Sequence, residues 1–130
     1  MQDFNGKVAV ITGGASGIGR SLAFALGRRG ASIAVGDVDA AAMSALESDL
    51  AAENIPALVA HCDVTSVDSL AALAAAAEQQ LGAMDLEFAN DGIGAGETGS
   101  MCDYSDKDWR WCRDVDLWGV FNCIKVFMPR

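Results

Sequence analysis

Basic residues are scarce in this sequence. It contains nine Lys and Arg residues against 18 Asp and Glu, which gives a formal net charge of −9 at pH 7. A surface of this sign repels phosphate backbones and anionic lipid headgroups. The composition therefore argues against nucleic acids and membrane surfaces as partners.

Other features that the sequence lacks indicate in which cellular compartment the protein is expected. No apolar stretch approaches the roughly 20 residues that span a bilayer, and the opening segment MQDFNGKVAV lacks the basic-then-apolar order of a signal peptide. The four cysteines form no C-x-x-C pair, and the single histidine, His61, has no ligand partners at a metal-binding spacing. We therefore expect no metal site, reduced thiols and a cytoplasmic location.

Hydrophobic residues are plentiful, at 52% of the 130 positions, so we expect a globular chain with one domain over 1–130. Short apolar runs predict four strands, at 7–12, 32–36, 57–61 and 86–89. Each run is followed by a stretch with helical spacing of its apolar residues. This alternation predicts an α/β fold in which parallel strands are joined by right-handed crossovers, with helices on both faces.

Residues that typically cap or break helices predict where the helices begin and end. Gly30 is expected to end the first helix, and Asp39 to cap the second, which Pro56 breaks. Two pairs resemble capping boxes. Thr65 with Asp68 precedes the third helix, and Ser105 with Asp108 precedes a last helix that runs to Pro129 after a loop over 90–104.

The segment ITGGASGIG, residues 11–19, places four glycines directly after the first strand. A backbone without side chains at this point lets a pyrophosphate come close, and the free amides at the following helix N-terminus point at it. A tight turn that merely tolerates glycine is the alternative. Asp37, at the end of the second strand, favours the nucleotide site because its carboxylate can accept from a ribose hydroxyl.

The pattern T-G-x-x-x-G-x-G at 12–19 resembles the short-chain dehydrogenase/reductase family. Further matches are CDV at 62–64, Asn90–Gly92 in the place of N-A-G, WRWCRDVDLWG at 109–119 in the place of the helix with V-N-L-x-G, and Pro129. The resemblance implies the cofactor-binding half of a doubly wound Rossmann-type sheet, truncated, with first-half strand order 3-2-1-4. The cofactor-binding residues that it implies are Gly13, Ser16, Gly17, Ile18, Gly19, Asp37, Asp63, Val64, Asn90 and Gly92.

The same resemblance favours NAD over NADP. Family members that use the 2′-phosphorylated cofactor carry a basic residue in the glycine loop or after the second strand, and here those places hold Ala15, Ser16 and Val38. Asp37 would repel a 2′-phosphate by about 3 kcal/mol at about 5 Å and an effective dielectric near 20. Asp37 can alternatively serve as a helix-capping carboxylate, or do both.

No catalytic residue is predicted. The family's acid–base pair Y-x-x-x-K and its serine lie beyond the last helix, and the single tyrosine, Tyr104, has a lysine three positions on instead of four, so we interpret it as a loop residue. Asp116 replaces the helix asparagine, and Asp91 replaces the alanine of N-A-G beside the expected cofactor. Glu87 lies inside the fourth strand, where we expect it to be solvated if that strand forms an edge.

Three functions stay open at this stage. The first is an NAD-dependent oxidoreductase part, inactive alone or completed by another chain. The second is a non-catalytic nucleotide-binding module. The third is an interaction protein that uses its last helix, 106–128, and the open sheet edge, because that helix is apolar almost all round and predicts self-association if left bare.

Overall fold

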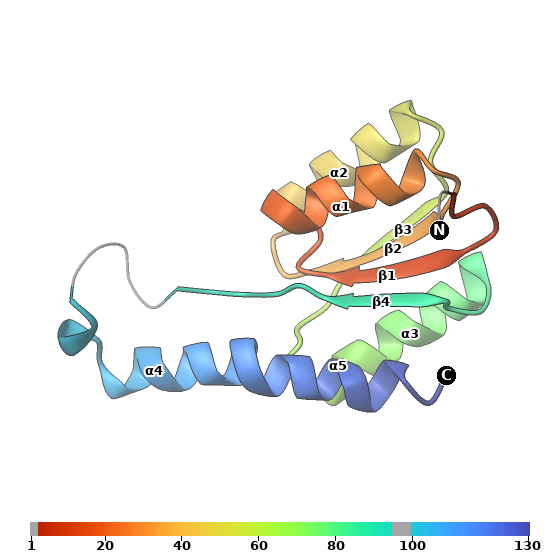
Figure 1. Cartoon of the computed structure of the whole chain (residues 1–130). Helices are drawn as coiled ribbons and strands as arrows, with labels where there is room; N and C mark the ends of the chain where they lie inside the picture. Colours follow the sequence, from red (N-terminus) through yellow and green to blue (C-terminus); the bar gives the residue numbers. More distant parts are fainter. Residues whose placement is uncertain (1–2, 95–99) are drawn as a thin grey trace.

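Four parallel strands form the centre of the computed structural model, which describes residues 3–94 and 100–130 (Figure 1). The strands are β1 (Val8–Thr12), β2 (Ser32–Asp37), β3 (Ala57–His61) and β4 (Leu86–Ala89). Their order is β3-β2-β1-β4, and β1 pairs in parallel with both β2 and β4. The predicted doubly wound arrangement is confirmed, and it puts the change of winding direction between β1 and β4.

Helices cover both faces of this sheet (Figure 1). On one face lie α1 (Gly17–Gly27) and α2 (Ala40–Ala52), and on the other lie α3 (Val67–Leu81) and α5 (Val120–Phe127). Successive β1 residues alternate between two separate cores, Ala9 and Ile11 in one and Val10 in the other. Every β1 residue is therefore buried, as a continuous apolar run predicts for a strand covered on both faces.

Two of the predicted caps are confirmed and one is wrong. Asp39 accepts from the amide of Ala42 at 3.0 Å, and Ser105 forms a full capping box with Asp108. The third helix is capped by Ser66, not by Thr65, which instead donates to Asp63 through its amide at 2.9 Å and its hydroxyl at 2.7 Å. Because the amide and the hydroxyl of Thr65 both donate to Asp63, the hydroxyl of the next residue, Ser66, caps the helix instead.

The first helix ends earlier than predicted. Its last α-helical residue is Gly27, and Arg29 and Gly30 then donate to carbonyls three residues back, at 3.0 Å each. This tightened turn lets Gly30, at φ +95°, lead the chain into β2.

The last helix contains a widened turn that the sequence did not predict. A short 3₁₀ turn, η1 (Met101–Asp103), precedes α4 (Asp106–Arg113), a π-helical stretch η2 (Asp114–Gly119), and α5. Figure 1 shows α4 extending beyond the sheet, whereas α5 packs below it. Residues 95–99 of the predicted loop lie outside the described part. No helix among the described residues is long and apolar enough to cross a membrane.

A row of large apolar side chains along this last helix is exposed, as predicted. We call these residues the apolar face; they are Trp109, Trp111, Leu117, Trp118, Phe121 and Ile124, with exposed fractions between 45% and 62%. Val126 and Phe127 are buried against the sheet, so the helix is not bare on every side.

The expectation that Glu87 is solvated is wrong. β4 is an edge strand, yet Glu87 is partly buried, and its Oε1 atom is buried without a hydrogen-bond partner among the described residues. Burial raises the pKa of this carboxyl group, because removing water disfavours the charged form. Phe127, the last residue of α5, and Met128, the residue after it, line a pocket together with Glu87.

Candidate functional site

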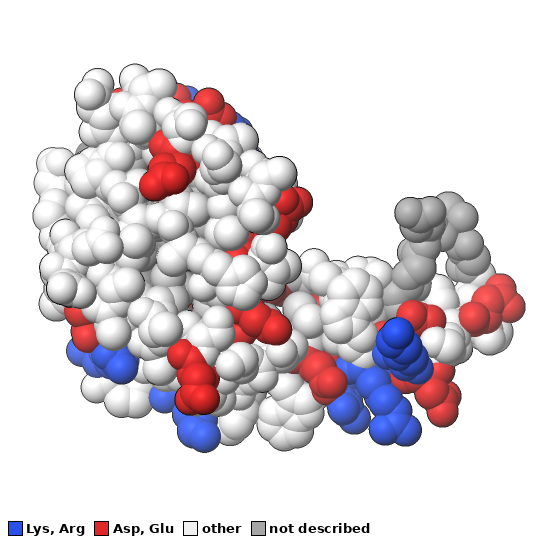
Figure 2. Space-filling view, turned by 180° about the vertical axis from the view of Figure 1, so that it is seen from behind, with Lys and Arg blue, Asp and Glu red and all other residues white. Residues whose placement is uncertain are grey.

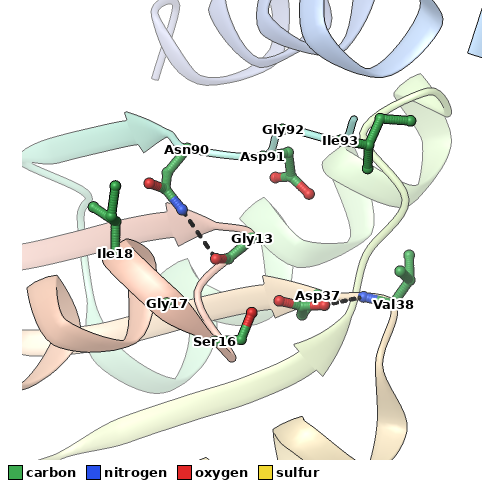
Figure 3. Close-up of a pocket in the computed structure, with 10 residues that line it drawn as sticks. All are labelled: Gly13, Ser16, Gly17, Ile18, Asp37, Val38, Asn90, Asp91, Gly92 and Ile93. Atoms are coloured by element: carbon green, nitrogen blue, oxygen red, sulfur yellow. Dashed lines mark hydrogen bonds between the residues drawn. The ribbon is translucent and has the colours of Figure 1, made fainter. Parts of the chain in front are cut away.

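A cleft of about 440 Å³ opens at the carboxyl ends of β1, β2 and β4 (Figure 3). Its position matches the switch point of the sheet, where open α/β folds bind ligands. The residues that line the cleft are Gly13, Ser16, Gly17, Ile18, Asp37, Val38, Asn90, Asp91, Gly92 and Ile93. Seven of these ten are predicted site residues; Val38, Asp91 and Ile93 are additional.

The glycine loop between β1 and α1 has the backbone conformation that a ligand cradle requires. Gly13 and Gly17 adopt positive φ values of +62° and +51°, which L side chains rarely adopt. A Cβ atom added at Gly17 would meet nothing within 4 Å, so the space in front of the helix start is open. Ser16 caps α1 by backbone conformation alone, without a side-chain hydrogen bond, and no acidic residue lies in the first turn. The first amides of α1 are therefore free for an external acceptor.

Gly19 supports this loop from below instead of lining the cleft. It is buried in α1, and a Cβ at this position would lie 2.6 Å from Nδ2 of Asn90 and 2.8 Å from Cα of Gly14. The Asn90 amide donates to the carbonyl of Gly13 at 3.0 Å, which ties the end of β4 to the loop (Figure 3). The close approach of loop, helix and β4 thus depends on the missing side chain.

Asp37 joins the end of β2 to the same loop. Its Oδ2 atom accepts from the amide of Ala15 at 2.9 Å, and its Oδ1 atom accepts from the amides of Val38 at 2.8 Å and Asp39 at 3.1 Å. The alternative role as a helix cap falls to Asp39, so Asp37 instead braces the glycine loop. A carboxylate has about four lone-pair sites, so it keeps acceptor capacity toward the cleft.

The structure does not bring Asp63 and Val64 to the lining of the cleft. Asp63 accepts from Thr65, and Val64 is buried at 3% exposure, where a Cβ on Gly119 would lie 2.6 Å from one of its methyl groups. A contact of these two residues with a cofactor stays a prediction.

The widened turn η2 connects the last helix to the cleft. Asp116, in the place of the family's asparagine, accepts from the amide of Ile93 at 2.9 Å and so holds the segment after β4. Asn122 donates to the carbonyl of Val64 at 3.0 Å. From the sequence, Asp116 was only the residue that replaces the family's asparagine. Its role as an acceptor was not predicted, because it depends on the Ile93 backbone that folds beside it.

Asp91 introduces a second carboxylate into the cleft. Its pKa is raised mainly by burial and further by the charges of Asp37 and Asp63, while the Thr12 hydroxyl acts in the opposite direction. Its Oδ2 atom is buried without a hydrogen-bond partner in the part of the chain that the structure describes. No lysine or arginine is among the lining residues.

No acid–base residue of the expected kind lines the cleft. Tyr104 lies between η1 and α4, outside the lining of the cleft, and the centroid of its ring is 6.2 Å from that of Trp109. Within residues 3–94 and 100–130, no three His, Cys, Asp or Glu side chains gather in a way that could hold a metal ion.

Comparison with known proteins identifies the family. The sequence profile of the short chain dehydrogenases matches residues 7–130. The chain belongs to the short-chain dehydrogenase family. The putative oxidoreductase SadH of Mycobacterium tuberculosis is 36% identical over 99% of this chain and 46% of its own length. Cyclohexanol dehydrogenase of an Acinetobacter species is 34% identical over 97% of this chain and 50% of its own length.

Solved structures of other short-chain dehydrogenases agree with the fold. One from Burkholderia phymatum, in complex with NAD, superposes with a TM-score of 0.92 at 37% identity, over 99% of this chain and 45% of that one. The chain thus spans about half the length of the relatives it matches. The predicted family and the predicted strand order are confirmed.

Proposed function

We propose that this short-chain dehydrogenase chain binds NAD and forms the cofactor-binding part of an oxidoreductase acting on an alcohol or carbonyl group. The observation that carries the proposal is the open space in front of α1, bounded by Gly13 and Gly17 and braced by Asp37. The amides at the start of α1 would hold the pyrophosphate, and Asp37 the adenosine ribose. When bound, the nicotinamide supplies the hydride acceptor or donor. The NAD complex of a relative supports this choice of ligand.

The lining supports NAD over NADP. Asp37 stands at the ribose end of the proposed site, and the residues around it, Ser16 and Val38, carry no positive charge that could pair with a 2′-phosphate. Like charges at about 5 Å with an effective dielectric near 20 repel by about 3 kcal/mol, which corresponds to about a hundredfold in affinity.

We infer that the chain alone does not catalyse hydride transfer. The residues of the cleft hold and orient a dinucleotide, but none of them is placed as a tyrosine–lysine pair that exchanges a proton with a substrate oxygen. Such a pair would have to come from outside residues 1–130. The cytoplasmic location stays a prediction from the reduced cysteines, all four of which are free.

Isothermal titration calorimetry at low salt, with NAD and NADP as ligands, tests the proposal. We expect NAD to bind and NADP to bind about a hundredfold more weakly. Ser16→Arg places a cation in the glycine loop, where the native side chain makes no cap hydrogen bond, and should narrow that gap. Ser44→Arg, on the exposed side of α2, adds the same charge away from the cleft and should leave the gap unchanged. A folded chain that gives neither heat nor a melting shift with NAD would refute the proposal.

Self-association is the second candidate function, and the exposed apolar face favours it. Its side chains include Trp118 and Phe121, whose rings pack edge to face. The ring centroids are 5.5 Å apart, and each side chain stays about half-exposed. We propose a second copy of this chain as the occupant. In an antiparallel pair the acidic first turn of α4, with Asp106 and Asp108, would face the partner copy's basic last turn of α5, which holds Lys125.

A further inference from the structure

The cleft carries two carboxylates that differ in their surroundings. Asp37 accepts three backbone amides and is thus compensated by the protein itself. Asp91 lies across the cleft at the end of β4, and one of its oxygens is buried without a partner among the described residues (Figure 3). For an ionised carboxylate, that one oxygen has neither water nor a donor, which makes its charge costly.

Asp91 cannot easily leave this place. Asn90, its neighbour, is fixed by the hydrogen bond to the Gly13 carbonyl. A Cβ atom at Gly13 would lie 2.9 Å from Cα and 3.1 Å from Cγ of Asp91, so the carboxyl group rests directly on the glycine loop. Any dinucleotide in the cradle therefore brings its negative pyrophosphate toward this group.

The charges around Asp91 are of one sign. Asp37 faces it from the end of β2, Asp63 follows β3, and Asp116 lies on η2 beside Gly92. The thiols of Cys62 and Cys123, on which the Asp91 charge acts, have pKa values raised mainly by burial to about 11 and about 12, so they are neutral at physiological pH. The single histidine, His61, is exposed and pairs with Asp37 in the sheet register, so it is the residue to control for in the test below.

Figure 2 shows the same pattern at larger scale. Asp and Glu atoms border the hollow between the body of the protein and the α4 extension, whereas the Lys and Arg atoms of this face lie on that extension, along the lower edge and at the top of the body. The hollow lies at the carboxyl ends of the strands, where the cleft opens. A doubly charged pyrophosphate thus gains no cation from the described lining and adds to the repulsion that Asp91 already meets.

We propose that Asp91 is a specificity-determining residue of this cleft that binds the dinucleotide only as the neutral carboxylic acid, so that binding takes up one proton from solvent. The inference rests on the proposed NAD-binding function. In its protonated form the group no longer repels the pyrophosphate, and its O–H supplies a donor to a ligand oxygen. Proton and ligand then bind to one site together, although the family pattern has an uncharged alanine there.

The direction of the pH effect follows from linkage. The ligand's negative charge raises the pKa of Asp91 further in the complex, so the complex holds its proton to higher pH than the free chain does. Affinity is full and constant below the pKa of the free chain. It then falls about tenfold for each pH unit until the pKa of the complex is passed. Because burial already raises the pKa of free Asp91 above the ordinary aspartate value, the fall begins on the neutral side of about pH 4.

Calorimetric titration with NAD between about pH 5 and about pH 8, in two buffers of different ionisation enthalpy, measures this uptake directly. The parent chain should take up about one proton per NAD in the sloping range. Asp91→Asn and Asp91→Ala should take up none, and at about pH 8 should bind NAD at least tenfold more tightly than the parent. His61→Gln should keep the parental slope.

The possible outcomes separate the two proposals. If the parent and Asp91→Asn bind NAD equally at every pH without proton uptake, the role of Asp91 is wrong and NAD binding stands. If His61→Gln removes the slope, the proton belongs to His61 and the inference is overturned. If neither the parent nor Asp91→Ala, both folded by circular dichroism, binds NAD at any pH, the proposed function itself fails and Asp91 has no ligand to select. If the parent binds NAD and Asp91→Ala does not, NAD binding stands and the inference about Asp91 is overturned.

Discussion

Gly19→Ala is the most direct perturbation of the cradle, because it adds one methyl group where the backbone leaves no room. That methyl group would lie 2.6 Å from Nδ2 of Asn90 and 2.8 Å from Cα of Gly14, and closer still to the carbonyl oxygen of Gly13. Two of these three neighbours are backbone atoms of the same loop, so they cannot turn aside as a flexible side chain could. Relief requires moving the loop off α1 and breaking the 3.0 Å hydrogen bond from Asn90 to Gly13.

The magnitude combines three terms. Overpacking costs about 1–3 kcal/mol, and the lost hydrogen bond costs about 1 kcal/mol. Replacing a helical glycine by alanine returns about 1 kcal/mol. We therefore expect a loss of about 2 kcal/mol in unfolding free energy. With about 2.1 cal/mol/K of unfolding entropy per residue, 130 residues give about 0.27 kcal/mol/K, so the melting temperature should fall by about 7 °C.

Thermal unfolding followed by circular dichroism measures this shift, and NAD calorimetry on the same samples should show weaker binding. Gly94→Ala is the matched control. Among the described residues, Gly94 has no atom within 4 Å of an added Cβ, and its φ is not positive, so alanine there should change stability only slightly, and upward. If Gly19→Ala melts within about 2 °C of the parent and binds NAD equally well, the tight loop–helix–β4 junction is not what shapes the cleft.

Two further predictions concern the edge strand and the last helix. Glu87→Gln should raise the unfolding free energy at neutral pH by about 1 kcal/mol, the lower end for an unsatisfied group because the residue is only partly buried. Since folding raises the pKa of Glu87, the advantage of the Gln variant should vanish as the pH falls below the unfolded pKa near 4. Urea unfolding at neutral pH and below about pH 4 measures this. An advantage that persists in acid contradicts the prediction. Leu117→Ser on the apolar face, with Leu117 at 62% exposed, should abolish the concentration-dependent mass increase expected for the parent in sedimentation, whereas Val38→Ser, at 59% exposed in the cleft, should not. A parent that stays monomeric at every concentration contradicts self-association.

The layout of the sheet was predictable because its signals are local. Runs such as VAVIT are apolar at every position, which marks a strand covered on both faces, and the glycine loop follows the first of them directly. Helix starts with one eligible cap, such as Ser105 with Asp108, were placed correctly. Where Thr65 and Ser66 compete, the outcome depends on Asp63, whose side-chain direction no spacing rule supplies.

The parts of the site that were not predicted depend on contacts between distant segments. The π-helical stretch around Asp116 coincides with the bond to Ile93 and the close approach of Gly119 to Val64, all remote in sequence. Val38 and Ile93 line the cleft only because their strands end beside the glycine loop. Asp91 was recognised as an unusual residue near the cofactor. Its packing on Gly13 became visible only in three dimensions.

Glu87 and Asp91 act in the same direction on folding, and Asp91 also acts on binding. Each is more protonated in the folded chain than in the unfolded chain at mildly acidic pH, because burial raises its pKa, so each contributes stability below its unfolded pKa and loses it as the pH rises through the folded one. The two lie four residues apart, on and just beyond β4. Protonation of Asp91 also removes the charge that opposes the pyrophosphate. A fall in pH toward the unfolded values therefore strengthens β4 and the cradle together, and removing the Asp91 charge should do the same at neutral pH. Stability and ligand affinity thus both increase when Asp91 is protonated, so at this residue neither is gained at the expense of the other.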